Sequence, residues 1–226
     1  MQNGDVCVTV SGVANEVNSN GANSVDGASL NAALNSCGVV QGEESPVTLP
    51  LVLDSAERLY LARYWLAERE LAAGLQARLN ISSDDHSNAP PTELLDQLFP
   101  PQPGQNGPDW QRVAAVVASM QRLCVITGGP GTGKTRTVAR LLAVLQAQLA
   151  QTPRIALLAP TGKAAARLLE SLRAEHGELE QQGLSLELPD TASTLHRALG
   201  YQPGRPGFKH NAGFPLPFDV VLVDEA

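Results

Sequence analysis

The sequence lacks the features that direct a chain into or across a membrane. No apolar run reaches about 18 residues, and the N-terminus has no basic start followed by an apolar block. Hydrophobic residues still make up 43% of the 226 positions, which is enough to build the cores of one or two globular domains. We therefore expect a globular protein that works in the cytoplasm without a membrane partner.

Cysteine and histidine are also scarce. The three cysteines, Cys7, Cys37 and Cys124, stand far apart, and the four histidines show none of the paired spacings that are typical of zinc ligands. The sequence therefore predicts neither a disulfide framework nor a zinc site.

Positive charge is in short supply, but only in the first half. The formal net charge is -7; residues 1–108 carry 4 Lys/Arg and 13 Asp/Glu, whereas residues 109–226 carry 12 and 10. This asymmetry fits a first half that faces protein and a second half that can approach a polyanion, although a solvated acidic surface is the commoner cause.

The first half has weak structural signals. Residues 11–36 are rich in Asn, Ser, Gly and Ala, so we expect a disordered loop over about 11–45. Extended segments are predicted near residues 6–10 and 47–53. Asp54 or Ser55 is then expected to cap a helix with a core-facing stripe of Tyr60, Tyr64, Ala67, Leu71 and Leu75.

The second half reads as alternating helices and strands. A short helix is expected over residues 92–98, and the Pro- and Gly-rich residues 100–108 suggest a domain boundary. Asp109 is placed to cap a helix whose inner side would carry Trp110, Val113, Ala114 and Val117. Apolar runs at residues 123–127, 155–159 and 220–223 predict a parallel sheet covered on both faces.

A glycine-rich loop carries the strongest chemical signal. Residues 128–135 match G-x-x-x-x-G-K-[ST] and comprise Gly128, Gly129, Pro130, Gly131, Thr132, Gly133, Lys134 and Thr135. Backbone N–H groups of such a loop surround a β-phosphate, and the following helix adds partial positive charge. We expect Lys134 to reach the β- and γ-phosphates and the Thr135 hydroxyl to ligate magnesium, so the loop predicts a site for ATP and Mg²⁺.

Two acids and one amide extend this prediction. Residues 219–226 form an apolar strand that ends in Asp224 and Glu225, of which the first would hold the magnesium shell and the second would polarise the attacking water. Surface carboxylates at a strand end are the competing interpretation. Gln111 lies on a different helix face from the apolar stripe and is placed to read an adenine edge, or it is simply an exposed glutamine.

Two further helix starts follow predicted turns. In residues 159–168 (APTGKAAARL), Thr161 and the following N–H groups form an anion-facing helix start beside Lys163. In residues 191–196, Ser193 or Thr194 is expected to cap a helix that carries His196. A phosphate backbone fits both places, although ordinary capped helices and a packed or solvated histidine explain them as well.

These motifs occur together in one known family. GGPGTGKT, APTGKAAARL, ASTLHRALG and DVVLVDEA, in this order and at these intervals, closely resemble superfamily 1B DNA helicases of the RecD type. The resemblance extends upstream to residues 50–72 and 109–119, is thin over 4–12 and is absent from 13–45. It implies an ATP-driven 5′ to 3′ motor on single-stranded DNA, which acts with the beta and gamma subunits of exodeoxyribonuclease V in double-strand break repair and recombination.

The resemblance also assigns roles and a fold. Gln111 would contact adenine, residues 128–135 phosphate, Asp224 and Glu225 magnesium and water, and Thr161, Lys163 and His196 the DNA. The implied fold class is α/β, with an incomplete RecA-like P-loop domain built on a parallel sheet and preceded by a smaller, mainly helical N-terminal domain. Residues 1–108 would be the partial, subunit-contact domain and residues 109–226 the truncated RecA-like ATPase domain 1.

Some expectations depart from the complete family pattern. The family's arginine finger and second RecA-like domain would lie beyond residue 226, so we expect no unwinding and at most trace ATPase activity from these residues alone. A single-subunit RecD-like helicase, a P-loop phosphotransferase and an assembly module with a vestigial ATP site are the alternatives. The phosphotransferase has no need of the motifs around Lys163 and His196, and the assembly module has no need of a complete set of phosphate and magnesium residues.

Overall fold

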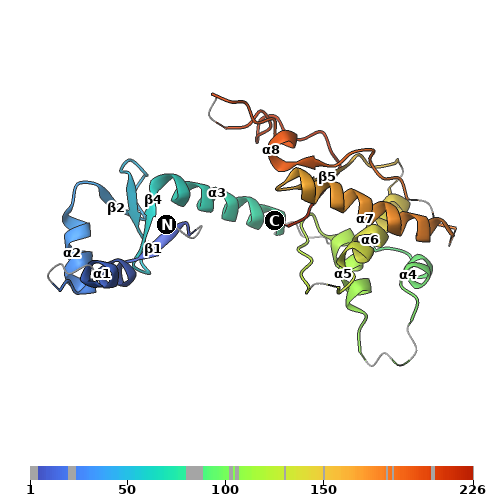
Figure 1. Cartoon of the computed structure of the whole chain (residues 1–226), viewed down its shortest axis with the longest axis horizontal. Helices are drawn as coiled ribbons and strands as arrows, with labels where there is room; N and C mark the ends of the chain where they lie inside the picture. Colours follow the sequence, from blue (N-terminus) through green and yellow to red (C-terminus); the bar gives the residue numbers. More distant parts are fainter. Residues whose placement is uncertain are drawn as a thin grey trace. The chain divides into compact units, whose positions relative to one another are not determined.

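The computed structural model describes residues 5–19, 24–79, 89–101, 104, 107–129, 131–149, 151–181, 183–184, 186–204 and 207–225. The chain divides into two compact units, Met1–Asn80 and Ile81–Ala226 (Figure 1). Over the described ranges, no helix is long and apolar enough to cross a membrane. The functional division that the sequence suggests at residue 108 stays a prediction.

A four-stranded mixed sheet forms the centre of the first unit. Its strands are β1 (Cys7–Thr9), β2 (Val40–Gly42), β3 (Leu51–Leu53) and β4 (Arg58–Leu61), in the order β1-β4-β3-β2. Strand β4 pairs antiparallel with both β1 and β3, whereas β2 and β3 are parallel. The extended segments predicted near residues 6–10 and 47–53 are confirmed, over shorter spans.

Two helices occupy much of the segment for which a disordered loop was predicted, so that prediction was wrong there. They are α1 (Val10–Ser19) and α2 (Gly27–Ser36). Asp26 caps α2 by accepting a hydrogen bond from the Ser29 N–H. Leu30 and Leu34, one helical turn apart, pack against a cluster around buried Val10. The Asp26 cap and the two leucines on one face therefore stabilise α2, although the composition of this segment predicted disorder.

Asp54 stabilises a turn between strands and caps no helix, contrary to the prediction. Its buried carboxylate accepts hydrogen bonds from the N–H groups of Ala56 and Arg58, and it forms an ion pair with the Arg58 guanidinium. Burial alone would raise the pKa of Asp54, but the hydrogen bonds from Arg58 outweigh it and lower the pKa. An aspartate that bonds the backbone two residues on favours a turn as readily as a helix start.

The predicted aromatic stripe is consequently split between two elements. Tyr60 is buried in β4, whereas α3 (Ala62–Leu79) begins only after that strand. Tyr64, Leu71 and Leu75 are exposed in the described structure. The prediction that the whole stripe belongs to the core was therefore wrong.

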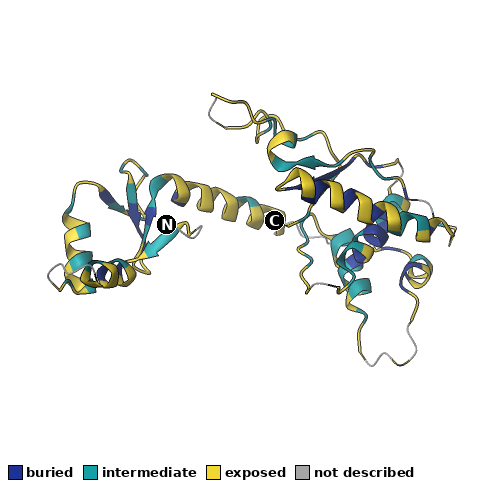
Figure 2. Ribbon diagram, viewed as in Figure 1, coloured by how far each residue is buried: buried dark blue, intermediate teal, exposed yellow. Residues whose placement is uncertain are grey.

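The second unit is a small α/β domain. Its helices are α4 (Thr92–Leu98), α5 (Trp110–Met120), α6 (Lys134–Gln148), α7 (Gly162–Gln181) and α8 (Leu195–Ala198), and its strands are β5 (Ile155–Ala159), β6 (Ser193–Thr194) and β7 (Val220–Val223). The strands are parallel, in the order β6-β5-β7. Strand β5 is buried along its whole length (Figure 2). This α/β domain, preceded by a unit in which α1, α2 and α3 accompany a small sheet, confirms the predicted partial RecA-like P-loop fold.

Two details of the second unit differ from prediction. Residues 123–127 form no strand, although Ile126 packs on the main core. Apolar composition alone does not make a segment a strand, because a strand also needs a neighbouring strand with which its backbone forms hydrogen bonds. Helix α5 also buries a different face, because Ala115 is fully buried whereas Trp110 and Val117 are exposed. The large side chains on that helix therefore do not mark its inner side.

Candidate nucleotide-binding site

The glycine-rich loop leads directly into α6. Gly131 and Gly133 have φ angles of 75° and 78°, in the left-handed region that only glycine adopts at little cost. Gly133 is the N-cap residue of α6, and the first turn of that helix contains no acidic side chain. The free N–H groups at this helix start therefore face no competing carboxylate from their own turn, which suits an anion. Pro130 lies outside the described residues.

Lys134 is folded back onto the loop. Its ammonium nitrogen Nζ donates to the carbonyl oxygens of Gly128 and Gly129, at 2.6 and 2.8 Å. The Thr132 hydroxyl also donates to the Gly129 carbonyl, at 2.9 Å. These neutral acceptors hold the ammonium near the inner side of the loop, and phosphate oxygens would exchange for them with stronger, charge-assisted bonds.

Thr135 follows in the first turn of α6 and is half-buried. A hydroxyl at this position, next to Lys134, is a hard oxygen donor of the kind that magnesium prefers. Among the described residues, no cluster of three or more His, Cys, Asp or Glu side chains is arranged to hold a metal ion. A magnesium ion here would have to share its shell with phosphate oxygens and water.

Gln111 connects α5 to the loop. Asp109 caps α5 by accepting hydrogen bonds from the N–H groups of Gln111 and Arg112, as predicted. The Gln111 amide nitrogen Nε2 then donates to the Thr132 carbonyl, at 3.2 Å. A Cβ atom at Gly133 would lie 2.7 Å from the same nitrogen, so this contact depends on glycine.

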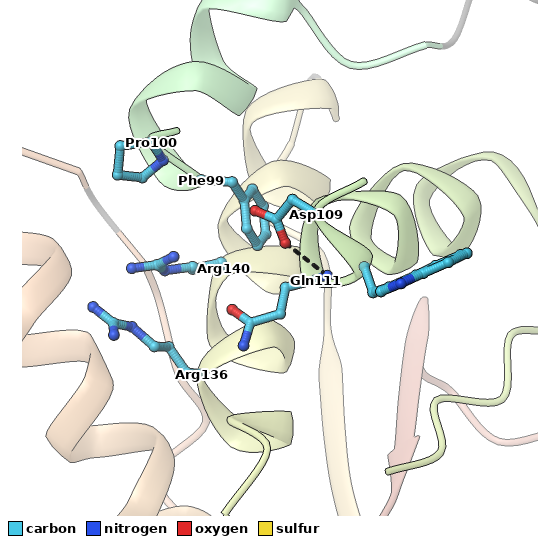
Figure 3. A pocket seen from close by; sticks show the side chains of 7 residues that line it. Phe99, Pro100, Asp109, Gln111, Arg136 and Arg140 are labelled. Carbon is cyan, nitrogen blue, oxygen red and sulfur yellow. Dashed lines mark hydrogen bonds between the residues drawn. The ribbon is translucent and has the colours of Figure 1, made fainter. Parts of the chain in front are cut away.

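A cavity of about 340 Å³ opens beside Gln111 (Figure 3). It is lined by Phe99, Pro100, Asp109, Trp110, Gln111, Arg136 and Arg140. Of these residues, only Gln111 was predicted to contact the nucleotide, whereas Asp109 was predicted as a helix cap and Trp110 as part of the inner side of α5. The pair Arg136 and Arg140, four residues apart on α6 just after Lys134, was the available signal for the rest.

The three strands of the sheet bring several predicted residues to one edge. Because Ala159 pairs with Thr194 and Leu158 with Val223, the carboxyl ends of β5, β6 and β7 are nearly level. Thr161, His196 and Glu225 each follow two residues after one of these strand ends. In parallel sheets, ligands bind at this edge.

Asp224 and Glu225 are at the end of β7. The Asp224 N–H donates to the Leu158 carbonyl at 2.9 Å, which holds a half-buried carboxylate at the sheet edge. Glu225 is exposed and has a φ angle of 56°, an uncommon conformation for a residue with a side chain. Over the described part of the chain, no hydrogen bond or ion pair joins either acid to the glycine-rich loop.

The residues predicted to face DNA are accessible. The Thr161 hydroxyl accepts a hydrogen bond from the Ala164 N–H at 3.2 Å at the start of α7, and Lys163 is exposed beside it. The exposed His196 ring makes edge contacts with Tyr201 and Phe208, at centroid distances of 5.8 and 5.9 Å.

Comparisons with known proteins identify a family model and several relatives that this chain resembles. A family model described as an AAA domain matches residues 111–226. The chain is similar to the RecBCD enzyme subunit RecD of Mycobacterium tuberculosis (strain ATCC 25618 / H37Rv), with 47% identity over 171 residues, which is 74% of this chain and 28% of the relative.

Two other relatives widen the comparison. RecBCD enzyme subunit RecD of Haemophilus influenzae is 43% identical over 59% of this chain and 21% of its own length. The ATP-dependent RecD2 DNA helicase of Deinococcus radiodurans is 33% identical over 83% of this chain and 23% of its own length. The chain thus spans less than a third of the length of these relatives.

Proposed function

Because the chain belongs to the AAA domain family and is RecD-like in sequence, we propose that it forms part of the ATP-driven motor of a DNA helicase. The observation that carries the proposal is the geometry of the glycine-rich loop. The Lys134 ammonium donates to two carbonyl oxygens of the loop, and the Gln111 amide donates to a third, that of Thr132. Such a loop holds a triphosphate through backbone N–H groups and a single ammonium.

ATP would be bound by Gln111 at the adenine and by the loop residues Gly128, Gly129, Pro130, Gly131, Thr132 and Gly133, together with Lys134 and Thr135, at the phosphates. Binding exchanges the two carbonyl bonds of Lys134 for bonds to phosphate oxygens, so the ammonium keeps hydrogen-bond acceptors in both states. The ordered glycines let the backbone approach the anion closely.

Magnesium fits the donors at hand, because the Thr135 hydroxyl and an Asp224 carboxylate oxygen are both hard ligands. Bound there, the ion would neutralise charge that develops on the phosphates. Glu225 accepts a hydrogen bond from the attacking water and orients it, since phosphoryl transfer depends mainly on positioning and electrostatics. In this assignment Lys134, Asp224 and Glu225 are the catalytic residues.

Single-stranded DNA would bind at the carboxyl edge of the sheet. Thr161 and the start of α7 offer N–H groups to a phosphate, Lys163 adds a positive charge, and His196 adds a ring. The second half of the sequence also carries the larger share of Lys and Arg. Movement on DNA would be 5′ to 3′, as in the resembling family.

The RecD names of the relatives support a further step. We place the protein in an exodeoxyribonuclease V complex of the RecBCD type, in the cytoplasm, with the beta and gamma subunits as partners in double-strand break repair and recombination. The acidic residues 1–108 would contact those subunits, and residues 109–226 would be the motor. The similarity to RecD2 supports the alternative of a single-subunit helicase.

The proposed ATP and DNA sites can be tested separately with two lysine variants. Lys134 and Lys163 both lie at the start of a helix that follows a turn, but only the first lies in the glycine-rich loop. Lys134→Ala is expected to weaken Mg²⁺-ATP binding by roughly thirtyfold, about 2 kcal/mol, while single-stranded DNA binding is unchanged. Lys163→Ala should weaken single-stranded DNA binding and leave Mg²⁺-ATP binding unchanged. Calorimetry and fluorescence anisotropy measure the two affinities.

Some results would contradict the proposal. Unchanged ATP affinity in Lys134→Ala would contradict the assignment of the glycine-rich loop as the nucleotide site. If neither variant changes DNA binding and DNA does not stimulate ATP turnover by the protein, a P-loop phosphotransferase explains the site better. Co-purification with the two other nuclease subunits, with and without residues 1–108, tests membership of the complex. If the complex still assembles after residues 1–108 are deleted, those residues do not make the essential subunit contact.

A further inference from the structure

Exposed aromatic rings are concentrated in the segment that follows α8. Residues 201–218 hold four of the nine Phe, Tyr and Trp residues of the chain, namely Tyr201, Phe208, Phe214 and Phe218. All four are exposed, by 38 to 56% (Figure 2). Because aromatic side chains usually bury their rings, a group of them in solvent indicates a surface that binds something.

The backbone beside two of these rings is held by hydrogen bonds. Tyr201 and Phe208 form an antiparallel bridge. The Tyr201 N–H donates to the His196 carbonyl at 2.9 Å, and the Lys209 N–H donates to the Gly200 carbonyl at 3.3 Å. Gly200 has a φ angle of 73°, and a Cβ atom there would lie 2.7 Å from that of Lys209, so this close approach requires glycine. Rings that are already positioned lose little freedom on binding.

His196, Tyr201 and Phe208 form an aromatic cluster with free ring surface. The His196 ring meets the other two at interplanar angles of 81° and 67°, and those two meet each other at 59°. Rings at such steep angles do not cover each other's faces, and Tyr201 and Phe208 stay 56% and 40% exposed. Because His196 follows β6 by two residues, the cluster lies at the carboxyl edge of the sheet.

The surroundings of the aromatic cluster are positively charged. Residues 191–218 contain no Asp or Glu but three Lys or Arg residues. Two of these, Arg197 and Lys209, are exposed, and the Lys209 ammonium lies 5.6 Å from the centre of the Phe214 ring. Exposed rings among cations, without acids, suit a strand of nucleic acid whose unpaired bases stack on the rings while its phosphates are attracted to the cations.

We propose that the aromatic cluster stacks on unpaired bases of single-stranded DNA, with Tyr201 and Phe208 supplying most of the stacking surface. The inference rests on the proposed DNA site and adds a contact of another kind to it, because the start of α7 with Thr161 and Lys163 offers contacts to phosphates alone. Every base has a flat face, so this contact depends on the presence of bases and not on their sequence.

The test compares two single strands of about 12 nucleotides: oligothymidylate, and an abasic strand with the same sugar-phosphate backbone. The unmodified protein is expected to bind oligothymidylate about tenfold more tightly. The double variant Tyr201→Leu with Phe208→Leu keeps apolar side chains and removes the flat rings. It should weaken oligothymidylate binding by about tenfold and leave the abasic strand unchanged, as measured by fluorescence anisotropy.

Two single variants serve as controls. Phe218→Leu removes a ring that is 38% exposed, close to the 40% of Phe208, but that lies just before β7, at the opposite edge of the sheet. It should change neither affinity. Lys163→Ala removes a phosphate contact, so it should weaken both strands alike and reduce the dependence of binding on salt. The double variant should leave the salt dependence as it is.

Three outcomes would overturn the inference. Equal binding of the two strands by the unmodified protein would do so whether or not the variants fold. Equal losses for both strands in the double variant would show a structural role, and no loss for oligothymidylate would show that the rings make no contact. If the unmodified protein binds neither strand, the proposed DNA site itself fails.

Discussion

The contact between Gln111 and the glycine-rich loop can be tested with two glycines that differ in one respect. Gly131 and Gly133 have nearly the same positive φ, 75° and 78°. A Cβ atom at Gly131 would meet nothing within 4 Å, whereas one at Gly133 would lie 2.7 Å from the Gln111 amide nitrogen. Replacing each by alanine therefore imposes the same backbone strain, and only the second adds a collision.

The magnitudes follow from these two terms. An alanine in the left-handed region costs about 1 to 2 kcal/mol, part of which is offset by about 0.5 kcal/mol from a less flexible unfolded chain. Gly131→Ala should thus destabilise by about 1 kcal/mol. Gly133→Ala also displaces the Gln111 amide from the Thr132 carbonyl and loses about 1 kcal/mol more. For a chain of this size, each kcal/mol lowers the melting temperature by about 2 to 4 °C.

The assay is thermal melting of both single variants, of Gln111→Ala, and of the double variant Gln111→Ala with Gly133→Ala. We expect Gly133→Ala to melt about 2 to 4 °C below Gly131→Ala. In the double variant the side chain that collides is absent, so its loss should be about 1 kcal/mol smaller than the sum of the single losses. Equal melting of the two glycine variants, or strict additivity in the cycle, would refute the packing of Gln111 against Gly133.

Three further outcomes are expected from contacts elsewhere in the chain. The pKa of Asp219 is lowered to about 2 from 3.8 by hydrogen bonds from Arg154, so the stability that this pair contributes is present above pH 3.8 and is lost as the pH falls through 2. The melting difference between the natural protein and Asp219→Asn should shrink over that interval; a constant difference would contradict the pairing. Asp109→Ala removes a helix cap and should cost about 1 kcal/mol in urea unfolding. Gln146→Ala removes two hydrogen bonds to the Glu187 backbone, of 2.6 and 2.8 Å, and should speed hydrogen exchange of the Glu187 amide; unchanged exchange would contradict that bridge.

Local patterns in the sequence predicted local structure well. The cap at Asp109, the cap at Thr194 and the short helix at residues 92–98 are confirmed, because each depends on residues within one helical turn. The apolar runs at 155–159 and 220–223 are confirmed as parallel strands. The roles of the site residues in binding and catalysis stay predictions, since no ligand contact tests them.

The failed predictions share a physical cause. Tyr60 and the run at residues 123–127 were assigned from periodicity or apolarity, but whether a segment is a strand depends on a ladder partner elsewhere in the chain. Helices α1 and α2 formed in a segment whose composition argued for disorder, because Leu30 and Leu34 found a cluster to pack against. Composition indicates how much apolar surface a segment can bury, but it does not show which apolar side chains will contact each other in the fold.

The sequence by itself determined the chemistry that contiguous residues can encode. The loop pattern at residues 128–135 fixes which residue carries the ammonium, which carries the hydroxyl and which positions must be glycine, because all of these interact within a few residues of each other. The same holds for the acids that end β7.

Only the tertiary structure decided what surrounds that loop. The packing of α4, α5 and α6 brings Phe99 to Arg140 and Gln111 to Thr132, pairs that are far apart in sequence. It also buries one guanidinium while leaving its neighbour, Arg136, with two carboxylates. Burial and partner choice are properties of the packed helices, so the burial of Arg140 against Phe99 could not be predicted from the order of residues.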